Sequence, residues 1–314
     1  MADTTSKPKL SQAALKTLFQ DDAQEKHFLQ TTQGMAIPLA APLIEHMGLD
    51  QDSRRRRSSP SSPVALLDLC CGAGLVRQEV GKTLGEEALG GSSFVCADSS
   101  DMMVGIVEKR IAAEGWANTE ARVLDAQDTG LAENSFTHVA ISLGIHLVPD
   151  PVAVFRECHR ILKDGGTLGA STFHASCADT FWRSDMRAAF ASFPFEAPFP
   201  SPMPLQAHDN GRWDDEAYVA EALRGCCSGG FADVDVRVRP GRYRIAGPEA
   251  WVDAFGSMLA FVMNTWWSED LRARHPLEEV KGLVLEYLRG SRGEEEGGWD
   301  VTWSLITVTG KAKK

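Results

Sequence analysis

The sequence lacks long apolar runs and has no excess of basic charge. No stretch of its 314 residues approaches the roughly 20 apolar residues of a membrane-spanning helix, and the start, MADTTSKPKL, has no secretory signal pattern. We therefore expect a cytosolic protein with no membrane partner. The net charge of −11 also disfavours a nucleic-acid partner, because such binding depends on clustered Lys and Arg. The basic run 54–57 lies in a Ser- and Pro-rich stretch typical of a linker rather than an import signal.

The sequence also lacks the cysteine spacing of a metal site. Its seven cysteines include the adjacent pairs Cys70/Cys71 and Cys226/Cys227, but no C-x-x-C pair. Neither a zinc site nor a secreted disulfide framework is indicated, and we expect reduced, mostly buried thiols. No Asp, Asp-Asn set suggests a magnesium site, so no bound metal is predicted. Hydrophobic residues make up 43% and charged residues 24%, which is ordinary globular usage.

The middle of the chain alternates between strand and helix patterns. The run VALLDL (64–69) is apolar, ends near glycines and predicts a buried parallel strand that enters a tight turn. Further strands are predicted at 93–98, 120–125, 135–142 and 165–173, with helices at 75–84, 99–115 and 151–163. Such alternation predicts a doubly wound parallel sheet, because right-handed crossovers place helices on both of its faces.

The flanking regions extend this core. Helical spacing at 11–29 and 34–49 predicts an N-terminal helical cap (1–49), followed by a linker at 50–63 and a cofactor-binding core at 64–173. The region 174–314 is predicted to hold a helical lid for an acceptor, which includes one helix over 269–290, and the last two strands, near 233–240 and at 301–310. The predicted fold class is α/β, a seven-stranded Rossmann-like doubly wound sheet with a helical cap and helical insertions.

The turn after the first strand reads Asp68-Leu-Cys-Cys-Gly72-Ala-Gly74. Glycines between a strand and a helix let backbone N–H groups approach a ligand closely. A dinucleotide fingerprint needs a third glycine, whereas position 77 is Arg. The carboxylate of Asp68 suits a cationic ligand, such as the sulfonium and ammonium of S-adenosylmethionine, rather than a pyrophosphate. As an alternative, Asp68 is only a turn or helix cap.

Three later strand ends carry polar groups at the same edge of the sheet, where open α/β folds bind ligands. Asp98 could accept hydrogen bonds from two vicinal ribose hydroxyls. The Ser99-Ser100 pair that follows it could contact the ligand or cap a helix, and the nearby methionines could simply be core. Asp125, Ala126 and Gln127 follow the third strand, where they could contact the amino edge of an adenine or could simply form a turn. The last candidates lie in the stretch from Ser142 to His146, after the fourth strand.

In order, the stretches LLDLCCGAG, VCADSSDMM, RVLDAQDTGLAENSFTHV and ECHRILKDGGTL resemble class I S-adenosylmethionine-dependent methyltransferases. They cover about residues 64–173. The later region resembles, more loosely, fungal secondary-metabolite methyltransferases that act on nitrogen or sulfur. The resemblance implies S-adenosyl-L-methionine as cofactor and S-adenosyl-L-homocysteine as product. It further implies Gly72, Gly74 and Ser142 at the methionine part, Asp98 at the ribose, and Met103, Asp125 and Ala126 at the adenine.

The acceptor is expected to be a small molecule. Methyl transfer is an in-line displacement, so positioning can supply much of the catalysis, and a base is needed mainly for an alcohol or phenol. His146 is the candidate base or acceptor contact, with a structural histidine as the alternative, and His174 is a weaker candidate. Phe28 and Trp182 are the favoured aromatic candidates for the acceptor pocket, although most aromatic residues at helical spacing are core.

Several other functions stay open on sequence grounds. A nicotinamide-dependent dehydrogenase shares the first strand, the glycine turn and the second acid, but Arg77 argues against it. A protein that binds S-adenosylmethionine without methylating, as a regulator or a cyclase, fits the same motifs. A protein or RNA methyltransferase is disfavoured by the acidic balance of the chain. The sequence indicates neither the methylated atom nor the oligomeric state.

Overall fold

The structure is a computed structural model that describes residues 38–50, 63–84, 86–292 and 297–314. The chain divides into two compact units. The first, here called the sheet unit, contains the described residues within 36–174, together with Asp209–Arg239 and Leu305–Lys314. The second, here called the helical unit, contains, among the described residues, Ala175–His208 and Pro240–Ser304. The boundary between the units falls within the last two strands of the chain, so each of these strands contributes to both units.

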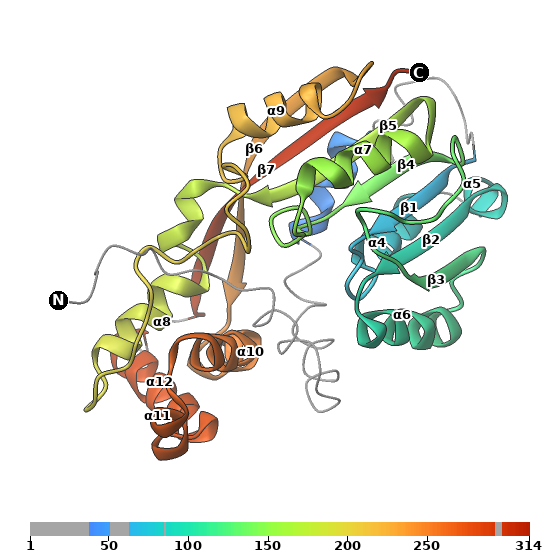
Figure 1. Cartoon of the computed structure of the whole chain (residues 1–314). Coiled ribbons are helices and arrows are strands. Elements are labelled where there is room, and N and C mark those ends of the chain that lie inside the picture. Colours follow the sequence, from blue (N-terminus) through green and yellow to red (C-terminus); the bar gives the residue numbers. More distant parts are fainter. Residues whose placement is uncertain (1–37, 51–62, 85, 293–296) are drawn as a thin grey trace. The chain divides into compact units, whose positions relative to one another are not determined.

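Seven strands form one sheet in the described residues, in the order β3-β2-β1-β4-β5-β7-β6 (Figure 1). The strands β1 to β5 are parallel where they pair, and β7 runs antiparallel to β5. The order reverses between β1 and β4, which is where open α/β sheets bind ligands. The seven-stranded prediction is confirmed. The strand bounds are β1 Ala65–Leu69, β2 Ser93–Asp98, β3 Thr119–Val123, β4 Phe136–Ile141, β5 Leu162–Phe173, β6 Phe231–Ile245 and β7 Trp299–Ala312.

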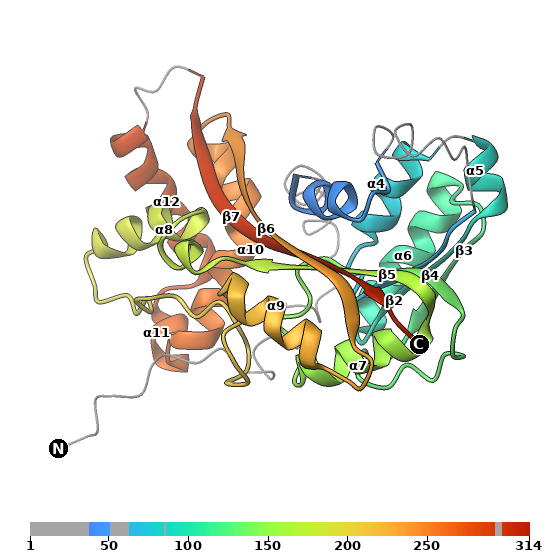
Figure 2. The same ribbon diagram turned by 90° about the horizontal axis from the view of Figure 1, so that it is seen from above.

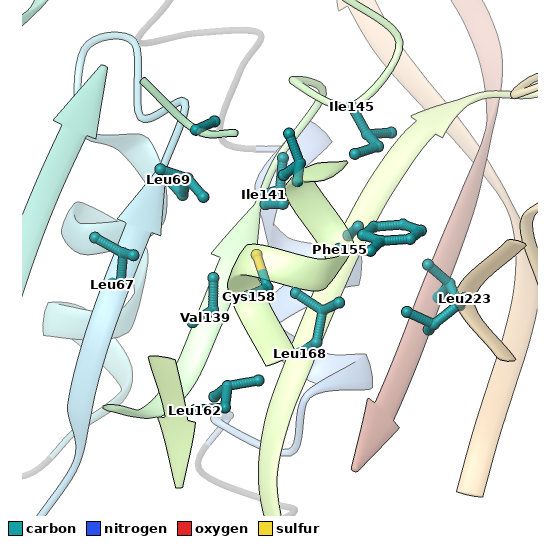
Figure 3. Packing of buried hydrophobic residues seen from close by; sticks show 14 of the residues in the cluster. Leu67, Leu69, Val139, Ile141, Ile145, Phe155, Cys158, Leu162, Leu168 and Leu223 are labelled. Carbon is teal, nitrogen blue, oxygen red and sulfur yellow. The ribbon is translucent and has the colours of Figure 1, made fainter. Parts of the chain in front are cut away.

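One face of the sheet is covered by α7 (Pro151–Ile161) and α9 (Glu216–Gly225). Because successive side chains of a strand point to opposite faces, the alternate residues Leu67 and Leu69 lie together on this face. Figure 3 shows them with Phe155 and Cys158 of α7, which are fully buried against the strands. This packing is the main hydrophobic core of the sheet unit.

The opposite face carries α4 (Leu75–Thr83), α5 (Glu86–Gly91), α6 (Asp101–Glu114) and a helix at 38–46. Leu43, Ile44 and Met47 pack with Leu66 of β1 and Val80 of α4. The described part of the predicted N-terminal cap therefore lies in the core of the sheet unit. The rest of that segment, including Phe28, lies outside the described residues. The short helix α5 was not expected from the sequence.

Several helices begin where the sequence supplies a cap. The Ser100 hydroxyl accepts a hydrogen bond from the Met103 N–H at the start of α6, and Asp150 accepts one from the Ala153 N–H at the start of α7. Pro151 occupies the first turn of α7, where a missing N–H costs no helical hydrogen bond. Helix α6 ends at Gly115 in the left-handed conformation.

The helical unit contains the turn η1 (Ala175–Asp179) and the helices α8 (Trp182–Ala191), α10 (Pro248–Trp266), α11 (Glu269–Arg274) and α12 (Leu277–Arg292). Helix α12 packs against α8 and α10 (Figure 2). The sequence predicted one helix over 269–290, and this was wrong, because the chain breaks between α11 and α12 at Pro276. A proline disfavours helical backbone at the residue before it, and His275 accordingly leaves the helical region at the end of α11. No helix of the described residues is long and apolar enough to cross a membrane.

Candidate functional site

The turn after β1 holds three residues with positive φ. Cys70 has φ 57°, Gly72 has φ 50° and Gly74 has φ 76°. The Gly74 N–H donates to the Cys71 carbonyl at 2.8 Å, which closes the turn just before α4 begins. A Cβ on Gly72 would meet no atom within 4 Å, whereas one on Gly74 would lie 3.1 Å from the Trp116 ring. Gly72 therefore borders open space, and Gly74 lets α4 and its neighbours pack closely.

Asp98 connects the ends of β1 and β2. Its Oδ2 accepts a hydrogen bond from the Gly72 N–H at 3.0 Å, and its Oδ1 accepts one from the Ser100 N–H at 3.0 Å. Burial raises the pKa of this carboxyl, and the backbone hydrogen bonds of Gly72, Ser100 and Ser99 oppose that effect. Each carboxylate oxygen has a second lone pair, so Asp98 can hold the turn and still accept hydroxyl hydrogen bonds from a ligand.

Asp68 lies in β1 beneath the glycine turn and is 1% exposed. Its Oδ2 accepts a hydrogen bond from the Arg77 N–H at 3.3 Å, so it does cap the first turn of α4. Within the described residues its buried Oδ1 has no hydrogen-bond partner. Burial raises the pKa of Asp68 well above its ordinary value, as does the nearby Asp98 carboxylate. An unsatisfied carboxyl oxygen at this point suits a cationic ligand rather than a phosphate.

Arg77 occupies the position where a dinucleotide fingerprint has its third glycine. Its guanidinium is buried, lies 4.1 Å from the Phe94 ring centroid and 5.3 Å from that of Trp116, and donates to the Thr119 hydroxyl at 2.8 Å. A Cβ on Gly81 would lie 2.5 Å from Arg77 Nη1, so the lack of a side chain at Gly81 leaves the space that the guanidinium occupies. Helix α4 thus packs through a long side chain instead of by close backbone approach.

The loop after β3 is fixed at both of its ends. The Leu124 N–H donates to the Asp98 carbonyl at 3.0 Å, and the exposed Asp125 accepts from the Gln127 N–H at 2.8 Å. The Gln127 Oε1 accepts from the Asp150 N–H at 3.1 Å, which ties this loop to the start of α7. Ala126 is buried in the main core, so only its backbone is available at the sheet edge.

The loop after β4 carries Ser142 and His146. Ser142 is half-buried, and the Leu143 N–H donates to the Ser171 hydroxyl of β5 at 3.1 Å. His146 is 5% exposed and packs edge-on against Phe173, with the ring centroids 5.6 Å apart. His174 lies 3.5 Å from the Glu216 carboxylate. The buried aromatic packing of His146 agrees with the structural alternative and leaves its role as a base a prediction.

The remaining candidates divide between the two units. Ser99 is exposed, and its neighbour Ser100 is the helix cap. Met103 is buried in α6, so its proposed adenine contact stays a prediction. Trp182 belongs to the helical unit, where it is buried beneath the Arg183 guanidinium, 4.7 Å from the ring centroid. Phe28 lies outside the described residues. No group of three or more potential metal ligands occurs in the part of the chain that the structure describes.

Sequence reasoning missed two residues of this site. Cys70 has the left-handed backbone of the glycine turn although it carries a side chain, and Gly144 packs against it. The available signal was the glycine-rich turn in which Cys70 lies, since glycines gather where the backbone needs positive φ. Nothing in the sequence marks Gly144, because its importance comes from a contact between distant segments.

The sheet order and the hydrogen bonds that connect the strand ends agree with the comparisons to known proteins. The family described as "Methyltransferase domain" matches residues 67–170. Over these residues the chain is similar to a methyltransferase domain, and the order of the strands agrees with that likeness. The match covers the carboxyl ends of β1 to β4, where the residues expected to bind S-adenosyl-L-methionine lie.

Three fungal relatives extend the likeness beyond the methyltransferase domain. Methyltransferase tpcH of Aspergillus fumigatus is 29% identical over 274 residues, which cover 86% of this chain and 92% of that protein. Methyltransferase ktnA of Aspergillus niger is 28% identical over 247 residues, which cover 73% of this chain and 79% of that protein. Acetylaranotin bis-thiomethyltransferase of Aspergillus terreus is 28% identical over 259 residues, which cover 82% of this chain and 84% of that protein. The likeness therefore includes most of the chain, in accord with the expected small-molecule methyltransferase.

The residues present fit S-adenosylmethionine. Asp98 offers two carboxylate lone pairs for a diol, and the buried Oδ1 of Asp68 lacks a hydrogen-bond partner among the described residues. Gly72 faces open space at the same turn. A carboxyl pair beside a glycine turn matches a ligand with a ribose and a positive charge.

Proposed function

We propose that this methyltransferase transfers a methyl group from S-adenosyl-L-methionine to a nitrogen, sulfur or oxygen atom of a small molecule, as the resemblance to secondary-metabolite enzymes implies. A sulfur acceptor is the first to test, because one relative is named as a bis-thiomethyltransferase. The single observation that carries the proposal is the Asp98 carboxylate, which joins the glycine turn to the start of α6 and keeps lone pairs for a ribose.

The proposed roles of the site residues follow from their places. Asp98 accepts the ribose hydroxyls, and the backbone of Gly72 and Gly74 passes beneath the methionine part. Asp68 offsets the positive charge of the ligand from below the turn, while Asp125, Ala126, Gln127 and Met103 border the adenine. Ser99, which follows β2, and Ser142, which follows β4, are proposed to contact the cofactor as well.

The bound cofactor supplies an electrophilic methyl group, and the protein supplies its orientation and the exclusion of water. Well-oriented intramolecular reactions gain roughly 7–11 kcal/mol, so alignment of acceptor, methyl and sulfur can provide most of the catalysis. A thiolate or neutral amine needs little activation, whereas a phenol or alcohol would give its proton to a base, for which His146 is the candidate. Phe28 and Trp182 are proposed to contact the acceptor.

The proposal is tested with methyl-labelled cofactor and a panel of small thiols, amines and phenols. We expect acceptor-dependent release of S-adenosyl-L-homocysteine and a labelled product, fastest with thiols. Calorimetric binding of S-adenosyl-L-homocysteine with no turnover of any acceptor would favour a regulator or cyclase instead. Binding of NAD without binding of either sulfur compound would overturn the assignment. The finer predictions, a cytosolic location and no nucleic-acid or metal partner, remain part of the proposal.

A further inference from the structure

The glycine turn after β1 and the loop after β4 touch at one tight point. A Cβ built on Gly144 would lie 2.5 Å from the Cβ of Cys70, 3.1 Å from its Sγ and 3.1 Å from a methyl group of Ile141. Two Cβ atoms do not approach this closely in folded proteins. Because a Cβ is fixed by its own backbone, no change of side-chain rotamer can relieve the overlap. A methyl group at position 144 therefore has to displace one of the two backbones.

Both backbones are held in place on their far sides. Next to Cys70, the Cys71 N–H donates to the Ala97 carbonyl of β2 at 2.9 Å. Next to Gly144, the Leu143 N–H donates to the Ser171 hydroxyl of β5 at 3.1 Å. Cys70 and Leu143 also have positive φ, 57° and 56°, a conformation that side-chain-bearing residues adopt only where the surroundings impose it. The contact is thus a close fit between two fixed segments.

Cys70 lies among the carboxylates of the predicted cofactor site. Burial raises the pKa of its thiol, and the neighbouring Asp98, Asp68 and Asp125 raise it further, which keeps the thiol protonated. Two residues along the same turn, the Gly72 N–H donates to Asp98. A displacement of Cys70 is therefore passed directly to the predicted ribose-binding carboxylate.

We propose that Cys70 and Gly144 form a steric pair that positions the glycine turn for the cofactor, so that Cys at 70 requires Gly at 144. The inference rests on the proposed function in that the positioned site is the one for S-adenosylmethionine. Both are positioning residues, since they act through the turn. The φ of Gly144 lies outside the left-handed region, so the predicted effect of alanine there is one of space.

A double-mutant cycle tests the pair. The variants are Gly144→Ala, Cys70→Gly and the two combined, and S-adenosyl-L-homocysteine binding is measured by calorimetry with thermal unfolding measured alongside. We expect Gly144→Ala to weaken binding by about tenfold or more, since a displaced turn would misalign the charged hydrogen bonds that Asp98 is proposed to make with the cofactor. In the Cys70→Gly background, which removes the Cβ and suits the positive φ, the same Gly144→Ala change should cost less than about threefold. Gly90→Ala is the matched control, because a Cβ there meets no atom within 4 Å.

Each result separates the pair from the broader assignment. If wild-type protein does not bind S-adenosyl-L-homocysteine, the proposed function fails. If wild type binds and Gly144→Ala binds equally well, or weakens equally in both backgrounds, the steric pair is wrong. If Gly144→Ala does not fold, the double variant decides: recovery of both folding and binding supports the pair, and no recovery contradicts it. In a working enzyme the pair predicts a raised KM for the cofactor with the KM for the acceptor unchanged.

Discussion

His46 provides a prediction about pH, because it joins the helix at 38–46 to the sheet while buried. Its side chain is 1% exposed, Nδ1 lies 2.8 Å from the Thr307 hydroxyl and Nε2 lies 3.0 Å from Asp235 Oδ2. These contacts are satisfied when neutral histidine donates from Nε2 to Asp235 and accepts at Nδ1 from Thr307. Burial lowers the pKa of His46, the Asp235 hydrogen bond raises it in part, and Arg237 and Arg239 lower it by repulsion.

The sign of the pH effect follows from that lowered pKa. At pH values between the pKa of His46 in the unfolded protein, 6.5, and its lowered pKa in the folded protein, the unfolded protein binds a proton that the folded protein does not. Stability linked to His46 is therefore complete above pH 6.5 and is lost as the pH falls below it. Over this window the loss is at most about 1.4 kcal/mol per pH unit, the free energy of one proton per unit.

The comparison of wild type with His46→Gln measures this effect, because glutamine can keep both hydrogen bonds but does not titrate. Hydrogen exchange of the 38–46 helix gives its opening free energy between pH 8 and pH 5. At pH 8 we expect the variant to be about 1–2 kcal/mol less stable, from poorer buried hydrogen bonds. That difference should shrink below pH 6.5, while all other titrating groups cancel. A difference that stays constant from pH 8 to pH 5 would refute the reasoning.

Three further variants or treatments test other parts of the sheet unit. Asp98→Ala should weaken S-adenosyl-L-homocysteine binding by about tenfold or more while the fold survives, since charged hydrogen bonds contribute about 1.5–3 kcal/mol; unchanged affinity in calorimetry counts against the ribose role. Arg77→Ala should cost about 2–4 kcal/mol of unfolding free energy in urea, from lost hydrogen bonds, ring contacts and a cavity; a loss under about 0.5 kcal/mol would contradict this packing role. Iodoacetamide at pH 8 should modify the half-buried Cys227 well before Cys158, whose burial raises its thiol pKa. Mass spectrometry that finds Cys158 modified first would be inconsistent with that burial.

The sheet could be predicted from the sequence because its strands and helices are set by local patterns. The apolar run at 64–69 and the acid at 98 each mark a strand that ends at the ligand edge, and the structure ends β1 and β2 at Leu69 and Asp98. The break at Pro276 was also visible in the sequence but was overlooked, because the apolar spacing continues on both sides of it. A helical period alone does not report where one helix stops and another begins.

The contacts that fix the site could not be predicted, because they join segments distant in the chain. His46 reaches a residue 189 positions away in β6 and another 261 positions away in β7. The guanidinium of Arg77 explains the missing third glycine only after Phe94 and Trp116 are seen around it. Composition and spacing supply the candidate groups, whereas their hydrogen bonds depend on the register of the sheet.

The strand ends are bonded to one another, and this bears on cofactor affinity. Asp98 holds the β1 turn and α6, its carbonyl holds the β3 end, and Gln127 holds the start of α7. A loop already ordered by such bonds loses less conformational entropy when a ligand binds, so more of the contact free energy appears as affinity. The affinity of this edge should therefore depend on residues such as Gln127 through the order they impose as well as through any ligand contact.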